Sequence, residues 1–195
     1  MSPVGPAVRV CVVALVAALF LIAVAPASAV NGWWKFRRET NINSTLFWVY
    51  TYPPNPTQYS FSWRAGSGTS TDACEVGKGW LPTGWYTLKG HWNGYDGSKI
   101  KGRVWWVQDK QCSNGTWRTE LFIHTEENSN NGQTCTSAYD DPFCWERVED
   151  HYSQGCIKLS YPTHISSAHS RYHDYGGRSA HGDFADDANE LYVYQ

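Results

Sequence analysis

The sequence predicts a mostly-β fold in a single exported domain. The chain holds 11 Trp, 12 Tyr and 17 Gly but only one Met, and aromatic residues at this density are typical of strands. Runs of β-branched and aromatic residues alternate with turns that contain Pro or Gly, and no internal repeat or heptad pattern interrupts them. Residues 30–195 have a suitable length for one domain with its own core.

The expected strands follow one another along the chain. Residues 44–52 (STLFWVYTY) form the first, and the run PPNP separates it from a second strand at residues 57–68. In that second strand Tyr59, Phe61 and Trp63 alternate with polar residues, so they fall on one face. Two strands joined across a proline turn predict an antiparallel hairpin. Further strands are expected at residues 85–88, 102–109, 117–125 and 190–194.

The remaining segments are expected to be loops and short helices. Residues 126–150 are rich in Asn, Gly, Ser and Asp, which predicts a long loop of the kind that is often functional. Residues 161–173 predict a short helix with Thr163 as its cap, and a helical turn is expected within residues 179–189, before the last strand.

The first 29 residues have the pattern of a secretory signal peptide. Arg9 precedes an apolar run at residues 10–25, and the segment ends in an A-x-A site at Ala29. The alternative is an uncleaved membrane anchor, for which the apolar run is short. No later segment is apolar enough to span a membrane, so we expect a secreted protein that lacks an integral membrane segment once the signal is cleaved.

The overall charge argues against a nucleic-acid partner. The formal net charge is −2, whereas proteins that bind nucleic acid carry a clustered basic excess. We therefore expect no nucleic acid among the partners. We also expect a monomer, and no cofactor or bound metal.

Cysteine counting predicts one spare thiol. After removal of Cys11 with the signal peptide, five cysteines remain, and an odd number in an oxidising compartment leaves one unpaired. The spare thiol can be a nucleophile, a partner in an intermolecular disulfide or an inert buried group. The five are Cys74, Cys112, Cys135, Cys144 and Cys156.

Cys156 is the cysteine best placed for chemistry. A nucleophilic cysteine needs a base within reach, and the two can lie far apart in sequence. His124 ends a predicted strand just before the long loop, and Cys156 follows that loop. Gly155 allows the backbone to turn tightly before Cys156, which exposes the sulfur and aims amide groups at a developing oxyanion.

These segments resemble the catalytic motif of the L,D-transpeptidase (YkuD-type) family of bacterial wall enzymes. The order is FIHT at residues 122–125, a loop, and then SQGCIKL at residues 153–159. The upstream hairpin and the turn LPTGWYTL are also similar to the family, so the resemblance covers residues 44–160. It implies a β-sandwich-like catalytic domain over residues 30–195 that acts on peptidoglycan stem peptides. The family's cysteine attacks a carbonyl next to diaminopimelate, and an amine or water resolves the thioester.

The resemblance implies a role for each residue of the motif. Cys156 is the nucleophile, His124 is its base, and the carbonyl of Thr125 orients the imidazole. The amides of Gly155 and Cys156 form much of the oxyanion hole, and Ser153 shapes the turn. Two positions depart from the family and are expected near the substrate: Gln154 replaces a histidine, and Lys158 replaces an arginine that helps to bind a carboxylate.

A free Cys156 leaves four cysteines for disulfides. They allow three pairings, of which we favour Cys74–Cys112 and Cys135–Cys144. The second pairing closes a small loop between base and nucleophile and restricts its motion.

Three other functions compete with this interpretation. One is a non-catalytic, aromatic-rich module that binds the cell wall. Another is a zinc-dependent wall peptidase, although the candidate ligands lie in an exposed Gly-Ser-rich stretch without the HExxH spacing. These ligands are His164, His169, His173, Asp174, His181 and Asp183. A papain-like hydrolase fits poorly, because its cysteine precedes its histidine in the chain.

Overall fold

The computed structural model describes residues 30–133, 144–146, 148–177, 182–183 and 189–195. For residues 182–183 it describes the backbone. The predicted signal peptide at residues 1–29 lies outside these ranges. In the part of the chain that is described, no helix is both long and apolar enough to cross a membrane.

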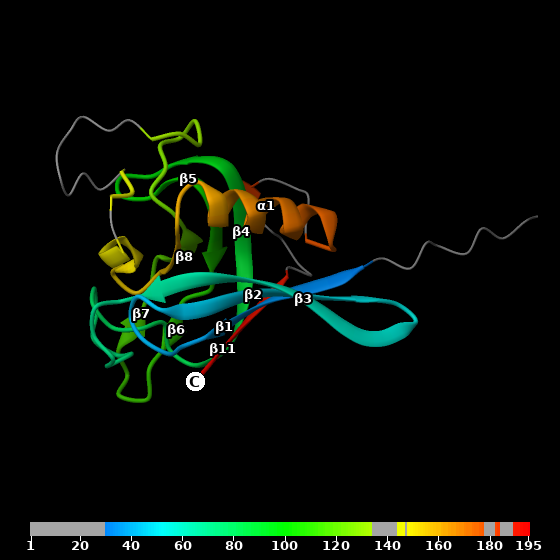
Figure 1. Cartoon of the computed structure of the whole chain (residues 1–195). Coiled ribbons are helices and arrows are strands. Elements are labelled where there is room, and N and C mark those ends of the chain that lie inside the picture. The colour runs from blue at the N-terminus through cyan, green and yellow to red at the C-terminus, as the bar shows by residue number, and fades with distance from the viewer. Residues whose placement is uncertain (1–29, 134–143, 147, 178–181, 184–188) are drawn as a thin grey trace, which may run out of the picture.

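Eight strands form a closed β-barrel in the order β4-β11-β1-β2-β3-β9-β8-β5, and β5 pairs back with β4. Figure 1 shows α1 lying across this barrel and the β2–β3 hairpin extending beyond it. The strands are β1 (Asn31–Arg37), β2 (Ser44–Tyr52), β3 (Asn55–Ser67), β4 (Gly84–Asp96), β5 (Lys101–Val107), β8 (Leu121–His124), β9 (Ile157–Leu159) and β11 (Glu190–Tyr194). The short β10 (Gly182–Asp183) adds to β4.

The β-sandwich expectation is therefore only partly right: the domain is mostly β, but its strands close into one barrel. Strand β4 explains the closure. Its first part pairs with β11, and its remainder pairs with β5 across two register shifts, at Leu88/Gly90 and Trp92/Tyr95. Such bulges bend a strand and increase its twist, so β4 joins both ends of the sheet.

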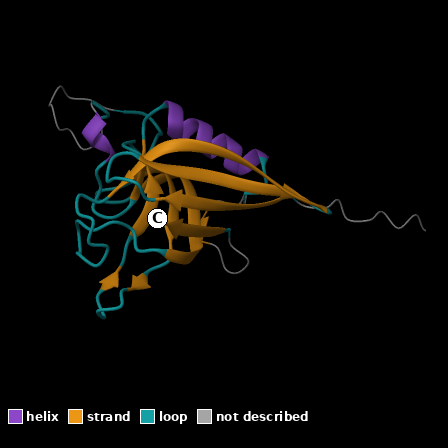
Figure 2. Ribbon diagram, turned by 60° about the horizontal axis from the view of Figure 1, so that its bottom comes forward, coloured by secondary structure: helices purple, strands orange, loops and turns teal. Residues whose placement is uncertain are grey.

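Several predicted elements are confirmed. The strands at residues 44–52 and 190–194 match β2 and β11, and β2 and β3 form the predicted antiparallel hairpin. The expected strand at residues 117–125 is split into β7 (Trp117–Arg118) and β8 at Glu120, whose φ is +56°. Strand β7 forms a small separate hairpin with β6 (Lys110–Gln111), visible apart from the barrel in Figure 2. Strand β1 was not predicted.

Two helices are described, the 3-10 helix η1 (Val148–His151) and α1 (Thr163–Asp174). The predicted helix is confirmed, but its predicted cap is wrong. Pro162 occupies the cap position, and no side chain there hydrogen-bonds to the helix end. Most of residues 179–189, where a helical turn was expected, lies outside the described residues.

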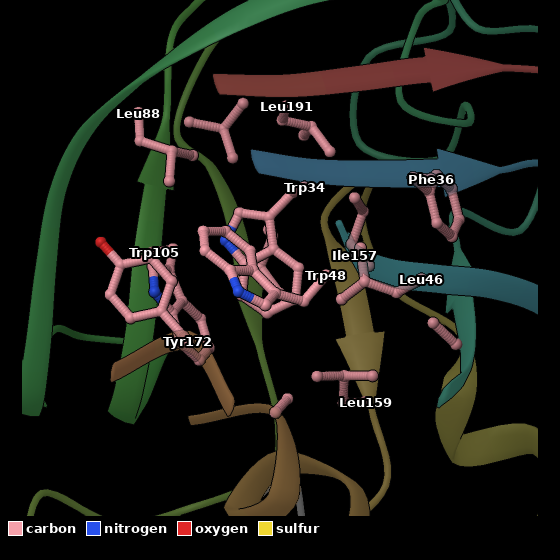
Figure 3. Close-up of a cluster of buried hydrophobic side chains, with 14 of the residues drawn as sticks. Trp34, Phe36, Leu46, Trp48, Leu88, Trp105, Ile157, Leu159, Tyr172 and Leu191 are labelled. Carbon is pink, nitrogen blue, oxygen red and sulfur yellow. The ribbon is translucent and has the colours of Figure 1, made fainter. Parts of the chain in front are cut away.

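Tryptophan dominates the barrel core. Trp34 packs against Trp48 and Trp105 with ring centroids 4.9 and 5.1 Å apart, and Tyr172 of α1 inserts among them (Figure 3). All four side chains are fully buried. These rings therefore account for part of the unusual aromatic content by packing alone.

The described cysteines agree with the predicted spare thiol. Cys74 and Cys112 form the expected disulfide, with Cα atoms 5.8 Å apart, and it ties the loop before β4 to the β6–β7 hairpin. Cys144 is disulfide-bonded, while its expected partner Cys135 lies outside the described residues. Cys156 is free and buried.

Candidate active site

Parallel pairing of β8 with β9 brings His124 and Cys156 to the same face of the barrel wall. Ile123 pairs with Ile157 and His124 pairs with Lys158. Both isoleucines are fully buried in the core, so the residues on either side of them face outward because side chains alternate along a strand. Cys156 lies directly before β9, two residues from the partner of His124, and it packs with Phe122 of β8 in a cluster outside the barrel core.

The imidazole of His124 is oriented by the backbone of the next residue. Its Nδ1 lies 3.0 Å from the carbonyl oxygen of Thr125. A carbonyl oxygen only accepts, so Nδ1 is the protonated nitrogen and the lone pair resides on Nε2. The Thr125 hydroxyl in turn donates to the carbonyl of Leu159 at 2.6 Å. The contact of Nδ1 with the Thr125 carbonyl is the one that the family resemblance implies, and it leaves Nε2 as the basic atom of His124.

The Cys156 sulfur rests against backbone rather than against imidazole. Its Sγ contacts the carbonyl oxygen of Glu120 at 3.6 Å. Burial raises the pKa of the Cys156 thiol to about 11, against the opposing effects of the Phe122 backbone and the Arg118 charge. Burial, together with the charge of Lys158, lowers the pKa of His124 to about 4. At neutral pH the site therefore holds a neutral thiol and a neutral imidazole.

Ser153 organises the turn that precedes the thiol. Its Oγ accepts from the amide of Gly68 at 2.9 Å and donates to the carbonyl of Cys156 at 2.6 Å. The amide of Gly155 also points at this Oγ, at 3.2 Å. Ser153 thus has the geometry of a turn-shaping residue, while the Gly155 amide, expected in the oxyanion hole, is engaged by the serine. The side chain of Gln154 is exposed.

Arg118 lies beside the site, and its role there was not predicted from the sequence. Its side chain is buried, and it donates to the carbonyls of Trp80 (3.1 Å), Gly79 (3.1 Å) and Gln154 (3.4 Å), as well as to that of Ala73. Burial lowers the pKa of Arg118. The guanidinium therefore joins the disulfide-bonded loop to the Cys156 turn. A lone arginine in the run NGTWR gives no sequence signal for this role.

Lys158 is already paired. Its Nζ forms an ion pair with Glu126, and both side chains are about nine-tenths buried. The ring of Trp145 lies 5.7 Å from the same Nζ. Burial raises the pKa of Glu126 to about 7, although Lys158 acts to lower it. Lys158 can bind a substrate carboxylate, as the resemblance implies, only if this pair opens.

Aromatic rings surround the thiol on the outer face. Cys156 packs with Val104 and Phe122 in a cluster separate from the barrel core. Phe122 lies 5.6 Å from Tyr95 and stacks on Trp106 with centroids 6.3 Å apart. The wall beside Cys156 is therefore apolar, which also accounts for its raised pKa.

The C-terminal histidines are arranged differently from the expectation. The stretch was expected to lack the spacing of HExxH, but this is wrong for His169 and His173, which lie four residues apart on α1. His91 of β4 joins them in space, and no sequence signal linked it to that stretch. Asp174 is exposed, and His164 lies in the first turn of α1. His181 and the side chain of Asp183 lie outside the description.

No protein-family model, curated protein or solved structure matches this chain. The family resemblance therefore rests on the motif residues of the sequence.

Proposed function

We propose that the protein is a secreted cysteine-dependent acyltransferase of the L,D-transpeptidase (YkuD-type) kind, acting on peptidoglycan stem peptides. One observation carries the proposal: the free Cys156 shares the outer face of adjacent parallel strands with His124, whose Nδ1 is fixed by the carbonyl of Thr125. A spare thiol, a base and an orienting group are the parts that nucleophilic cysteine catalysis requires.

The proposed reaction has two halves. Sγ of Cys156 attacks the donor carbonyl while Nε2 of His124 takes the thiol proton, and the tetrahedral oxyanion then collapses. The leaving amine takes that proton from His124, and a thioester remains on Cys156. An acceptor amine, or water, attacks the thioester while giving a proton to His124, and His124 passes that proton to the departing sulfur of Cys156, which restores the thiol.

The two pKa values decide the order of events in the first half. A thiol of pKa about 11 does not pass its proton to an imidazole of pKa about 4 before substrate arrives. Proton transfer therefore accompanies formation of the C–S bond, as general-base catalysis allows. Contacts of this kind are often long in a substrate-free site and shorten in the complex, which fits the contact of Sγ with Glu120 in the free protein.

Muropeptide turnover tests the proposal. The secreted protein is incubated with tetrapeptide muropeptides, and products are followed by mass spectrometry for wild type, Cys156→Ala and His124→Gln. His164→Gln is the control, because it removes a histidine outside the site. We expect cross-linked dimers, or loss of the terminal residue, from wild type and control alone. Unchanged substrate with wild type, or turnover by Cys156→Ala, contradicts the proposal.

Export is part of the proposal and has its own test. Cleavage after Ala29 would give a secreted protein whose first residue is Val30, and N-terminal sequencing reads this directly. A secreted chain that retains residues 1–29 contradicts it.

A row of stacked rings, of which Trp85 is exposed and Tyr192 and Tyr194 are half-buried, favours a second candidate, the wall-binding module. Trp85 stacks on Tyr192 with centroids 4.7 Å apart, and Tyr192 stacks on Tyr194 at 5.6 Å. Trp85 is 55% exposed, and flat rings in a row suit the faces of sugar units in a glycan. If binding is the main function, Trp85→Ala weakens retention on purified cell walls while Trp117→Ala, at a similarly exposed ring, does not.

A further inference from the structure

Three histidines converge between the barrel and α1. Nε2 of His173 lies 3.2 Å from Nε2 of His91 and 3.2 Å from Nε2 of His169. The ligand atoms of all three lie within 4.8 Å of one another. His91 is fully buried, whereas the two helix histidines are partly exposed.

A shared cation accounts for this arrangement more fully than hydrogen bonds among the three rings do. An imidazole nitrogen has one position in the ring plane, filled either by a proton or by a lone pair. Nε2 of His173 therefore has at most one proton to share between its two neighbours at 3.2 Å. A single cation, by contrast, accepts lone pairs from all three nitrogens at once.

The spacing fits a tetrahedral metal ion. Zinc binds histidine nitrogen at about 2.0–2.1 Å, which places two ligands of a tetrahedron about 3.3 Å apart. The two Nε2–Nε2 separations of 3.2 Å are close to that edge, and the ligand atoms of the remaining pair, His91 and His169, lie within 4.8 Å of each other. Imidazole is a preferred ligand of zinc and of neighbouring first-row metals.

The buried ligand is oriented as metal ligands usually are. Nδ1 of His91 lies 2.8 Å from the carbonyl of Val104, so Nδ1 carries the proton and Nε2 presents its lone pair to the cluster. A backbone carbonyl on the second nitrogen is a common support for metal-binding histidine. The ring also stacks on Trp105, with centroids 4.8 Å apart and planes within 11°, which fixes its direction.

We propose that His91, His169 and His173 form a binding site for a divalent first-row transition metal, with zinc as the best fit. The site joins α1 to β4 through three neutral imidazoles and leaves a fourth position for water or another ligand. It is separate from the candidate active site, since His91 stacks on a core tryptophan while Cys156 belongs to the outer cluster. The inference does not depend on the proposed acyl transfer.

Zinc titration of the metal-stripped protein tests the site. We expect one bound zinc per chain after gel filtration, and a higher melting temperature with zinc than without. His169→Gln and His173→Gln should each weaken binding more than 100-fold, beyond the 10–100-fold effect of losing an outer-shell partner. The matched controls are His164→Gln, on the same helix, and Cys156→Ser, which removes the free thiol; both should bind as wild type does.

Cobalt provides a readout that needs no variant. Wild-type protein loaded with Co²⁺ should show the visible absorption of a tetrahedral site without a thiolate charge-transfer band. Less than one-fifth of an equivalent of zinc on wild type, full binding by both glutamine variants, or loss of binding in Cys156→Ser overturns the inference. All these measurements omit muropeptide, so they succeed or fail independently of the proposed enzyme activity.

Discussion

Gly155→Ala is expected to damage the turn that positions Cys156. Gly155 has a φ of +117°, in the region that favours glycine, and a Cβ added there would overlap Nη2 of Arg118 and lie 3.0 Å from the carbonyl oxygen of Gly79. The guanidinium cannot easily move aside, because backbone carbonyls hold it on several sides. The substitution therefore combines backbone strain with a steric clash.

The loss of folding stability can be separated into these two contributions by comparison with a matched glycine. Gly84 has a φ of +118°, and a Cβ there would meet the flexible end of Lys110 at 2.5 Å. Gly84→Ala thus carries the backbone strain, about 1–3 kcal/mol. Gly155→Ala adds overpacking against a fixed group, a further 1–3 kcal/mol or so. We expect the Gly155 variant to be the less stable of the two by that second amount.

Urea unfolding of both variants, with disulfides intact, measures the difference. The urea concentration at the unfolding midpoint should be lower for Gly155→Ala than for Gly84→Ala, with the same dependence of unfolding free energy on urea concentration. The muropeptide turnover of Gly155→Ala should fall as well. Equal stability of the two variants would show that Arg118 does not constrain the turn at Gly155.

Three further predictions concern the site and its support. Lys158→Met leaves Glu126 buried without its partner and should cost about 3–5 kcal/mol at pH 8. The pKa of Glu126 is about 7 with Lys158 present and should rise further without it, so the carboxyl is protonated at pH 5 and the cost should shrink there. The cost should also shrink in the double variant with Glu126→Gln, and a pH-independent loss in urea unfolding would count against this. Replacing Cys74 and Cys112 by serine opens a 38-residue separation and should cost about 4 kcal/mol by chain entropy, so a loss under 1 kcal/mol would show that this loop is restrained by other contacts. With a pKa of about 11, Cys156 should be about 0.1% thiolate at pH 8, and its alkylation by iodoacetamide should rise only toward pH 11; a midpoint near pH 8 without substrate would contradict the buried-thiol geometry.

Local patterns in the sequence predicted much of the fold but not its closure. The strands at residues 44–52 and 190–194 and the helix near residues 161–173 have regular composition and clear turn residues at their ends, so they could be predicted. Strand β1 was missed, although NGWWKFR is aromatic, because it directly follows the predicted signal peptide. Barrel closure depends on the bulges in β4, and no period in the sequence encodes which strands will meet there.

The candidate site, too, could be predicted only in part from the sequence. The motif placed His124, Thr125 and Cys156 in order along the chain, and the parallel pairing of β8 with β9 brought His124 and Cys156 to one face. Arg118 and His91 act through contacts with segments distant in sequence. Their spacing along the chain carries no signal, so they could be found only once the fold was known.

Intact mass spectrometry of the acyl-enzyme tests the central claim most directly. The protein is mixed with a tetrapeptide donor without an acceptor amine and quenched in acid, which preserves thioesters. We predict an added mass equal to the donor without its terminal residue, located on the peptide that contains Cys156 and released by hydroxylamine. The adduct should be absent from Cys156→Ser and reduced in His124→Gln. A wild-type protein that turns over the donor with no adduct on Cys156 at any quench time, or an adduct located on another residue, would contradict the assignment of Cys156 as the nucleophile.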